Sequence, residues 1–170
     1  LITTCASPPS TQATAAAAQH TEDVLLRSNT VLEAFGNAKT ARNDNSSRFG
    51  KYIKLLYDRT LRLVGARTDH FLLEKSRLVH LENGERTFHI LYQVTSALPA
   101  DQKEGLFLSG PAESFSLLNQ GNCLEASDHV DDHEGLKAVD EALSSLGFSL
   151  GHKTDIWRLL AAILHSGEVR

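Results

Sequence analysis

A short polar loop carries the residues of this chain that are best suited to chemistry. Residues 43–50 read Asn-Asp-Asn-Ser-Ser-Arg-Phe-Gly and bring together an amide, two hydroxyls and a guanidinium. Hydroxyl oxygen is a hard ligand that suits Mg2+, amide and backbone N–H groups donate to phosphate oxygens, and the planar arginine cation can bind phosphate with two hydrogen bonds. The combination predicts a magnesium-phosphate site, and the competing interpretation is a plain polar turn, which uses the same residue types.

The segments on both sides of this loop resemble one protein family. Residues 31–40 lead into the loop and residues 50–54 lead out of it, and together they resemble the switch I region of the myosin motor domain. Kinesins have a related N-x-x-S-S-R pattern followed by Ser-His, whereas Phe49 and Gly50 follow here. The resemblance continues, in the order and at about the spacing of the family, through four further blocks at residues 71–77, 84–93, 118–120 and 156–165.

The resemblance implies a role for each of four loop residues. Asn43 would donate to the nucleotide phosphates, and Ser46 would contact the terminal phosphate and the attacking water. Ser47 would ligate Mg2+, and Arg48 would pair with a glutamate on switch II. ATP and Mg2+ are therefore the expected cofactors, with Ser46 and Arg48 as catalytic residues. A phosphoryl group that leaves with spread negative charge needs fixed donors and a metal more than a covalent partner.

The resemblance also sets expectations for the fold and the whole protein. It implies an α/β, predominantly helical, partial P-loop NTPase fold of the myosin head type, with two strands of a larger mixed sheet. The parent protein would couple MgATP hydrolysis to movement on an actin filament in the cytoplasm, associated with the cytoskeleton. Light chains and cargo would bind through other regions. The alternative is a non-catalytic interaction protein derived from a decayed motor, because Thr30 stands where the family usually has Pro and residues 165–169 also depart from its pattern.

A complete phosphate-binding loop is not expected within the 170 residues. Residues 36–40 partly match the pattern G-x-x-x-x-G-K-[ST], but Ala38 occupies the position where glycine must let the backbone wrap around phosphate. The Gly50-Lys51 pair is followed by Tyr52, where a hydroxyl for the metal is required. The chain alone is therefore expected to lack ATPase activity.

Composition is ordinary for a folded protein and excludes several classes of function. Of the 170 residues, 41% are apolar and 22% are charged, and the net charge of −4 gives no basic face for nucleic acid. No transmembrane segment is expected. Cys5 and Cys123 lack the spacing of a metal site, which favours a reducing cytosol. The absence of methionine suggests an internal segment of a longer chain.

Patterns along the chain divide a single partial motor domain, residues 1–170, into parts. Residues 7–20 are small and polar and predict a flexible surface loop, although four alanines at its end could extend the following helix. Apolar spacing predicts a helix, or two short ones, over residues 22–36. The switch I loop is expected over residues 37–50, two antiparallel strands over 49–73, and upper-cleft helices over 87–166.

Three other polar features are weighed against a structural role. Residues 128–133 gather three carboxylates and two imidazoles, which could bind a metal, but a solvated connector before a helix is the favoured interpretation. His89 and His165 lie within helical blocks and are expected to pack or form hydrogen bonds. Residues 74–77 read Glu-Lys-Ser-Arg and are expected to connect the strands to the upper cleft without chemistry.

Overall fold

One long helix leads to the polar loop. The computed structural model describes the backbone of residues 11–127 and 130–169, and side chains from residue 19 onward. Helix α1 (Thr11–Gly36) corrects the prediction of a flexible loop over residues 7–20, because residues 11–20 are helical; residues 7–10 lie outside the described part. Alanine has the highest helix propensity, which accounts for the earlier start. The helix continues through Thr30. A proline at this position would lack the backbone N–H group that a helix interior uses.

The loop itself contains a small ladder. Strands β1 (Asn37–Ala38) and β2 (Ser46–Ser47) pair in an antiparallel manner, with Asn37 opposite Ser47 and Ala38 opposite Ser46. Ala38 also bridges to Phe88 at the start of the helical region. The predicted loop is therefore a hairpin whose base is held by backbone hydrogen bonds.

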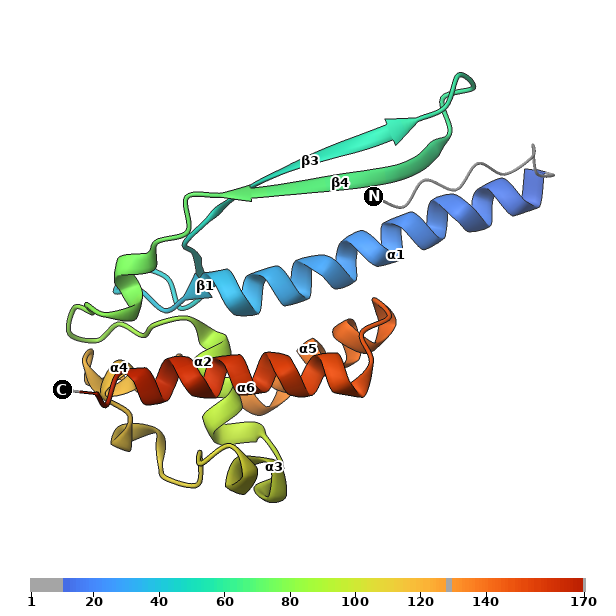
Figure 1. Ribbon diagram of the computed structural model, residues 1–170. Coiled ribbons are helices and arrows are strands. Elements are labelled where there is room, and N and C mark those ends of the chain that lie inside the picture. The colour runs from blue at the N-terminus through green and yellow to red at the C-terminus, as the bar shows by residue number, and fades with distance from the viewer. Residues whose placement is uncertain (1–10, 128–129, 170) are drawn as a thin grey trace.

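A long hairpin follows directly. Strands β3 (Gly50–Tyr57) and β4 (Leu63–Phe71) are antiparallel, with a register shift between Leu56 and Tyr57. Figure 1 shows this hairpin lying along α1 on the side away from the other helices. The two predicted strands are confirmed, and in the described residues they form a separate two-stranded sheet.

The Asp58 carboxylate organises the turn of this hairpin. It accepts hydrogen bonds from the Thr60 hydroxyl and from the backbone N–H groups of Thr60 and Arg62. These bonds, that of the Thr60 hydroxyl first, lower the pKa of Asp58 to about 2. Aspartate at this position of the turn therefore has a direct structural role.

The remaining elements are helical and short, apart from the last two. A 3-10 helix η1 (Lys75–Leu78) leads to α2 (His89–Ala97). Helix α5 (Asp132–Ser145) is capped by the Asp131 carboxylate, and helix α6 (Leu150–Ser166) by a capping box in which Ser149 and His152 bond each other's backbone. The other elements are α3 (Ala100–Gly105), η2 (Ala112–Ser114) and α4 (Ser116–Asn119). Helices predominate over residues 87–166, as predicted.

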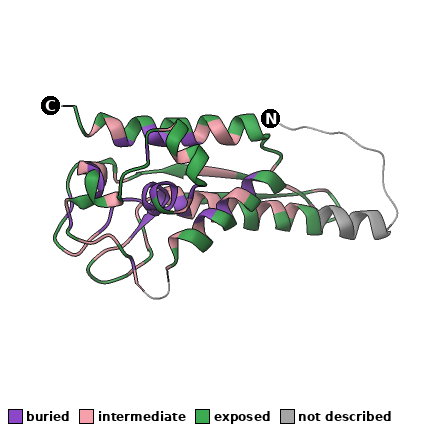
Figure 2. Cartoon of the chain, turned by 90° about the horizontal axis from the view of Figure 1, so that it is seen from below, coloured by how far each residue is buried: buried purple, intermediate pink, exposed green. Residues whose placement is uncertain are grey.

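Helix α2 forms the centre of the core. Its residues from His89 to Thr95 are all buried, and it packs against α1, α5 and α6. Figure 2 shows the buried residues concentrated on this central helix. Just before it, the guanidinium of Arg86 is fully buried, lies 3.8 Å from the centre of the Tyr92 ring and binds both oxygens of Asp132 at 2.9 Å. A cation thus sits within the core because a ring and a carboxylate both compensate its charge.

No described helix is both long enough and apolar enough to cross a membrane.

Candidate functional site

The polar loop is closed at its base. The backbone N–H of Arg48 donates to the carbonyl of Gly36 at 2.8 Å, and the Phe49 ring lies against Gly36. A Cβ atom at Gly36 would come within 2.4 Å of that ring. Glycine at this position therefore lets the end of α1 touch the start of β3.

Short-range hydrogen bonds shape the tip of the loop. The Thr40 backbone N–H and hydroxyl both donate to the Asn43 carbonyl, and the Thr40 hydroxyl accepts from the Asn43 N–H. The Asn43 side-chain oxygen accepts from the Asn45 N–H at 2.9 Å. Since that oxygen is engaged within the loop, the Asn43 amide nitrogen is the group left to donate outward. An ion pair between Lys39 and Asp44 braces the same turn.

A cavity of about 350 Å³ opens beside the loop. Asn43, Ser46 and Arg48 line it, together with Arg77 and Glu85. Three of the four predicted site residues are therefore brought together. Thr40 and Arg42 also line the cavity, which thus has one amide, two hydroxyls and three guanidinium groups beside the Glu85 carboxylate. Such a donor set suits an anion such as phosphate.

Ser47 does not line this cavity. It pairs in the β1–β2 ladder beside Ser46, and successive strand residues point to opposite faces. Its side chain is exposed, and its hydroxyl donates to the Phe49 carbonyl at 3.1 Å. Because this bond uses the hydrogen, the lone pairs of the oxygen remain available to a cation.

Arg48 joins a chain of charged groups. Its Nε donates to Glu74 Oε2 at 2.6 Å, and Arg77 Nε donates to the same oxygen at 2.7 Å. Arg77 Nη1 then donates to Glu85 Oε2 at 2.9 Å, and Glu85 Oε1 accepts the backbone N–H of Ala41 at 3.2 Å. The network starts in the loop, passes through the segment after β4 and returns to the loop.

The network shifts the acid–base properties of its members. The hydrogen bond from Arg48, supported by Arg77, lowers the pKa of the Glu74 carboxyl. Burial alone would lower the pKa of Arg77, but the hydrogen bonds that Arg77 donates to Glu74 and Glu85 outweigh it and raise the pKa. Both shifts favour the charged forms, so Glu74 and Arg77 stay charged near neutral pH.

Glu74 and Arg77 are the functional candidates that sequence reasoning missed. Residues 74–77 were expected to have only a connecting role, yet Glu74 contacts a predicted site residue and Arg77 lines the cavity. Opposite charges three positions apart were the available signal. The expected pairing of Arg48 with a glutamate of switch II stays a prediction, and Arg48 Nη2 has no partner among the described residues.

A second set of polar contacts lies at Asn45. Its side-chain oxygen accepts from Asn37 Nδ2 at 3.1 Å and contacts His89 Nε2 at 3.2 Å. Burial, assisted by the nearby Arg86 charge, lowers the pKa of His89 to about 4. His89 is thus a buried, hydrogen-bonded residue as predicted, and His165 likewise contacts the Leu106 carbonyl at 3.0 Å.

The acidic segment before α5 has a structural role where it is described. Asp131 caps the helix and Asp132 binds Arg86, while Asp128 and His129 lie outside the described residues. No group of His, Cys, Asp or Glu in the described part of the chain could hold a metal ion. Asp131 and Asp132 lie at the start of α5, as the connector interpretation of residues 128–133 expects, but the Asp132 side chain is mostly buried against Arg86 and is not solvated.

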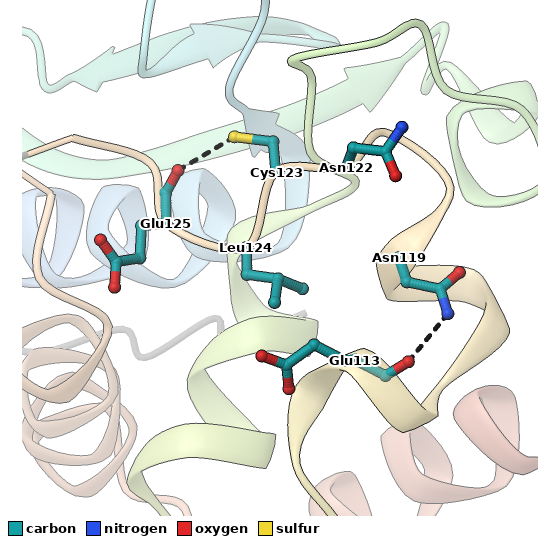
Figure 3. A pocket seen from close by; sticks show the side chains of 6 residues that line it. All are labelled: Glu113, Asn119, Asn122, Cys123, Leu124 and Glu125. Carbon is teal, nitrogen blue, oxygen red and sulfur yellow. Dashed lines mark hydrogen bonds between the residues drawn. The ribbon is translucent and has the colours of Figure 1, made fainter.

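A cavity of about 830 Å³ lies in a different region. Figure 3 shows its walls, where the Cys123 thiol donates to the Glu125 carbonyl and the Asn119 amide donates to the Glu113 carbonyl. The Cys123 thiol and the Asn119 amide are thus both hydrogen-bonded to backbone carbonyls. None of its lining residues belongs to the predicted site.

Comparisons with known proteins agree on one family. The sequence profile described as Myosin head (motor domain) matches residues 4–170. Myosin-51 of Schizosaccharomyces pombe is 47% identical over 148 residues, which is 87% of this chain and 10% of that protein. The Myosin IB heavy chain of Dictyostelium discoideum is 42% identical over 151 residues, which is 89% of this chain and 13% of that protein. The chain spans about a tenth of the length of the relatives that it matches, and it belongs to the myosin motor-domain family.

Proposed function

We propose that this chain supplies switch I to a motor that hydrolyses MgATP and moves on actin. The observation that carries the proposal is the closed loop, which gathers Asn43, Ser46 and Arg48 around one polar cavity. Membership of the family supports motor function in general. The same proposal includes the P-loop NTPase fold and the larger mixed sheet. It also includes a cytoplasmic location on the cytoskeleton, with light chains and cargo bound elsewhere in the protein.

The residues of the loop fit a magnesium-bound nucleotide. Bound Mg2+ neutralises phosphate charge and holds the terminal phosphoryl group in position. The Asn43 amide nitrogen would donate to phosphate oxygens, the Ser46 hydroxyl would hold the terminal phosphate and the attacking water, and the free lone pairs of Ser47 would ligate the metal. Ser46 and Ser47 occupy opposite faces of one short strand. Because Mg2+ binds phosphate oxygens directly, the strand would have to turn for Ser46 to hold the phosphate while Ser47 holds the metal.

Arg48 would act as a gate in this site. Its Nε is held by Glu74 and its Nη1 donates to the Ser46 hydroxyl at 3.1 Å, which fixes the guanidinium beside the catalytic serine. The remaining Nη2 is available for the proposed switch II glutamate. Pairing there would close the site around ATP, since a fixed planar cation orients a carboxylate.

The chain by itself should be inactive. Its 170 residues hold no G-x-x-x-x-G-K-[ST] sequence, so segments outside them would have to supply the phosphate cradle and switch II. Calorimetric titration of the isolated chain with MgATP should show only weak binding. A stoichiometric, magnesium-dependent site of micromolar affinity would contradict this division of the nucleotide site.

The decisive variant is Ser47→Ala in a motor that contains this chain. Loss of a metal ligand should slow MgATP turnover by about a hundredfold or more. Ser145→Ala is the matched control, because Ser145 also donates to a backbone carbonyl, that of Glu141, but lies in α5. Wild-type turnover in Ser47→Ala would remove Ser47 from the site. If the unmodified motor shows no turnover, the alternative of a non-catalytic interaction protein replaces the proposal.

A double charge reversal tests the gate. Arg48→Glu should preserve nucleotide binding but stop hydrolysis, because like charges would oppose closure. Reversing the switch II glutamate as well should restore part of the single-turnover rate. If the double variant is no faster than the slower single variant, Arg48 acts on phosphate directly and the gate assignment is wrong.

A further inference from the structure

The turn before α2 contains a dipeptide that can react with itself. Asn83-Gly84 is the only Asn-Gly pair in the sequence. Asparagine is thermolabile, because the backbone nitrogen of the following residue can attack its side-chain carbonyl carbon. Glycine at the following position leaves that nitrogen unhindered, since it has no Cβ atom. The pair therefore holds both reactants of a deamidation, and the surrounding structure decides whether they can meet.

The pair occupies the two central positions of a tight turn. The Glu85 N–H donates to the Glu82 carbonyl at 3.1 Å, and Gly84 has a φ of +83°. A positive φ at the third residue is the pattern of a type II turn. Asn83 is exposed, and a Cβ atom at Gly84 would meet nothing within 4 Å. Water therefore reaches the reacting groups.

One contact favours attack on the Asn83 side chain. Asn122 Nδ2 donates to Asn83 Oδ1 at 3.1 Å. Figure 3 labels Asn122 in the wall of the 830 Å³ cavity. The oxygen that accepts this bond is the one that becomes negative when the carbonyl carbon is attacked. A donor already in place there stabilises the developing charge.

A second contact restrains the attacking nitrogen. The Gly84 N–H donates to the Gly121 carbonyl at 2.7 Å. The nitrogen can attack only after it has lost this hydrogen, so the hydrogen bond must open first. Gly121 is buried, and a Cβ atom there would lie 2.0 Å from the Glu85 carbonyl oxygen. Glycine at position 121 therefore lets the two segments come close enough for the bond to form.

We propose that Asn83 is a self-modification site that the Gly121 carbonyl keeps latent. When the bond opens, the Gly84 nitrogen gives its proton to water and bonds to Asn83 Cγ. The Cγ–Nδ2 bond then breaks, and Nδ2 takes a proton and leaves with the bonding electron pair as ammonia. A second water opens the resulting succinimide ring to aspartate or isoaspartate at position 83. Water is the only other reactant, and nothing is oxidised or reduced.

Conversion would change the segment that holds the polar loop. Glu85 Oε1 accepts from the Ala41 N–H, and the Arg86 N–H donates to the Lys39 carbonyl at 3.1 Å. Isoaspartate adds one methylene group to the main chain two residues before Glu85. The turn then no longer places the Glu85 carboxylate at the loop. This chemistry does not depend on nucleotide or on the proposed motor function.

Peptide mapping by mass spectrometry, after incubation in mildly alkaline buffer, tests the proposal. In the urea-unfolded chain, Asn83 should convert faster than any other asparagine. Gly84→Ala should slow that conversion severalfold, because its methyl group hinders the nitrogen. In the folded chain, conversion should be at least about tenfold slower than in urea, as the loss of one hydrogen bond predicts. Hydrogen exchange at the Gly84 N–H should be slowed by a similar factor, because both processes need the same bond to open.

A matched pair of variants tests the restraint. Gly121→Ala should accelerate both Asn83 conversion and Gly84 exchange in the folded chain, because the added Cβ atom drives the segments apart. Gly105→Ala, with nothing within 4 Å of its Cβ position, should change neither. If Gly121→Ala does not fold, the wild-type chain in increasing sub-denaturing urea decides, since both rates should rise in parallel.

The converted chain provides the last readout. Exchange at the Ala41 N–H should be faster than in the unmodified chain, because Glu85 no longer accepts that hydrogen. Four results would overturn the proposal: equal conversion rates in the folded and unfolded chains, faster conversion at another asparagine in urea, faster Gly84 exchange without faster conversion, or unchanged Ala41 exchange after conversion.

Discussion

Two arginines share a single carboxylate oxygen at the edge of the loop. Arg48 and Arg77 reach Glu74 Oε2 at 2.6 and 2.7 Å. The Arg77 side chain is buried, whereas those of Arg48 and Glu74 are 28% and 33% exposed. Exposed ion pairs contribute little individually, about 1 kcal/mol or less. The value of this arrangement is therefore positional, because one anion holds the guanidinium of Arg48 beside Ser46.

Acid titration of Glu74 should release both arginines together. Arg48, assisted by Arg77, lowers the pKa of the Glu74 carboxyl below 4.5. The contribution of these ion pairs to the stability of the fold is therefore present above pH 4.5 and is lost as the pH falls through the lowered pKa. The Nε–H signals of Arg48 and Arg77 in 15N NMR should move with one midpoint below pH 4.5. Glu74→Gln should abolish this response, and Glu104→Gln in exposed α3 should not. Different midpoints for the two arginines would rule out a shared partner.

His89 should make the chain less stable in mild acid. Its pKa is lowered from 6.5 to about 4 by burial and by Arg86, so the folded state resists a proton that the unfolded chain accepts. Stability should therefore fall as pH drops from 6.5 to about 4, by about 3 kcal/mol. Urea denaturation of wild type and His89→Gln across this range measures the difference. His80→Gln, at an exposed histidine, is the control and should retain the wild-type dependence.

At the scale of elements, the loop depends on contact between its two ends. Gly36 ends α1, Phe49 precedes β3, and the hydrogen bond from Arg48 to Gly36 closes the base. The hairpin β3–β4 then returns the chain so that Glu74 meets Arg48, and the Glu74 N–H donates to the Arg48 carbonyl at 2.9 Å. The long hairpin is thus the element that positions the charged network.

Gly36→Ala should loosen the loop. The added Cβ would lie 2.4 Å from the Phe49 ring, so the ring must move and the base must open. Hydrogen exchange at the backbone N–H of Arg48 should become at least about tenfold faster, corresponding to the loss of one hydrogen bond. Gly105→Ala is the matched control, since nothing lies within 4 Å of its Cβ position. Unchanged exchange at Arg48 would show that the ring contact does not hold the base.

The elements were predictable where the pattern is local. Local residue patterns predicted the strands within 49–73 and the helices within 87–166, which include α5 and α6. The early start of α1 at Thr11 was predicted only in part, as the alternative in which four alanines extend the helix, because low complexity was given more weight than alanine propensity. The Arg48–Glu74 pair and the contact between His89 and Asn45 could not be predicted, because they depend on how distant segments pack.

At the scale of the whole molecule, burial is uneven. The helices surround a continuous core around α2, whereas the β3–β4 hairpin leaves large apolar side chains in solvent. Adjacent residues of a strand point to opposite faces, yet Leu55 and Leu56 are 46% and 51% exposed. The hairpin is therefore uncovered on both faces at this point, and both of its outer edges are unpaired in the described residues.

The exposed hairpin should drive self-association of the chain. Unpaired edges and apolar faces favour pairing with other copies. Leu56→Lys combined with Val64→Lys should increase the monomer fraction in sedimentation velocity, because it places charge on both strands. Leu150→Lys, at a residue 74% exposed on α6, should have little effect. An equal gain from Leu150→Lys would mean that net charge, and not the hairpin, controls association.

The closed base of the polar loop has a consequence for the speed of a switch. Bringing together the ends of a free segment of about ten residues costs conformational entropy, roughly 2 kcal/mol from the loop-length term. The hydrogen bond between Arg48 and Gly36 and the adjacent β1–β2 ladder already hold the ends together, so ligand binding does not have to supply this free energy. The tip can therefore disorder and order again without a chain search. Its local rearrangement should take place in nanoseconds to microseconds, much faster than a catalytic cycle.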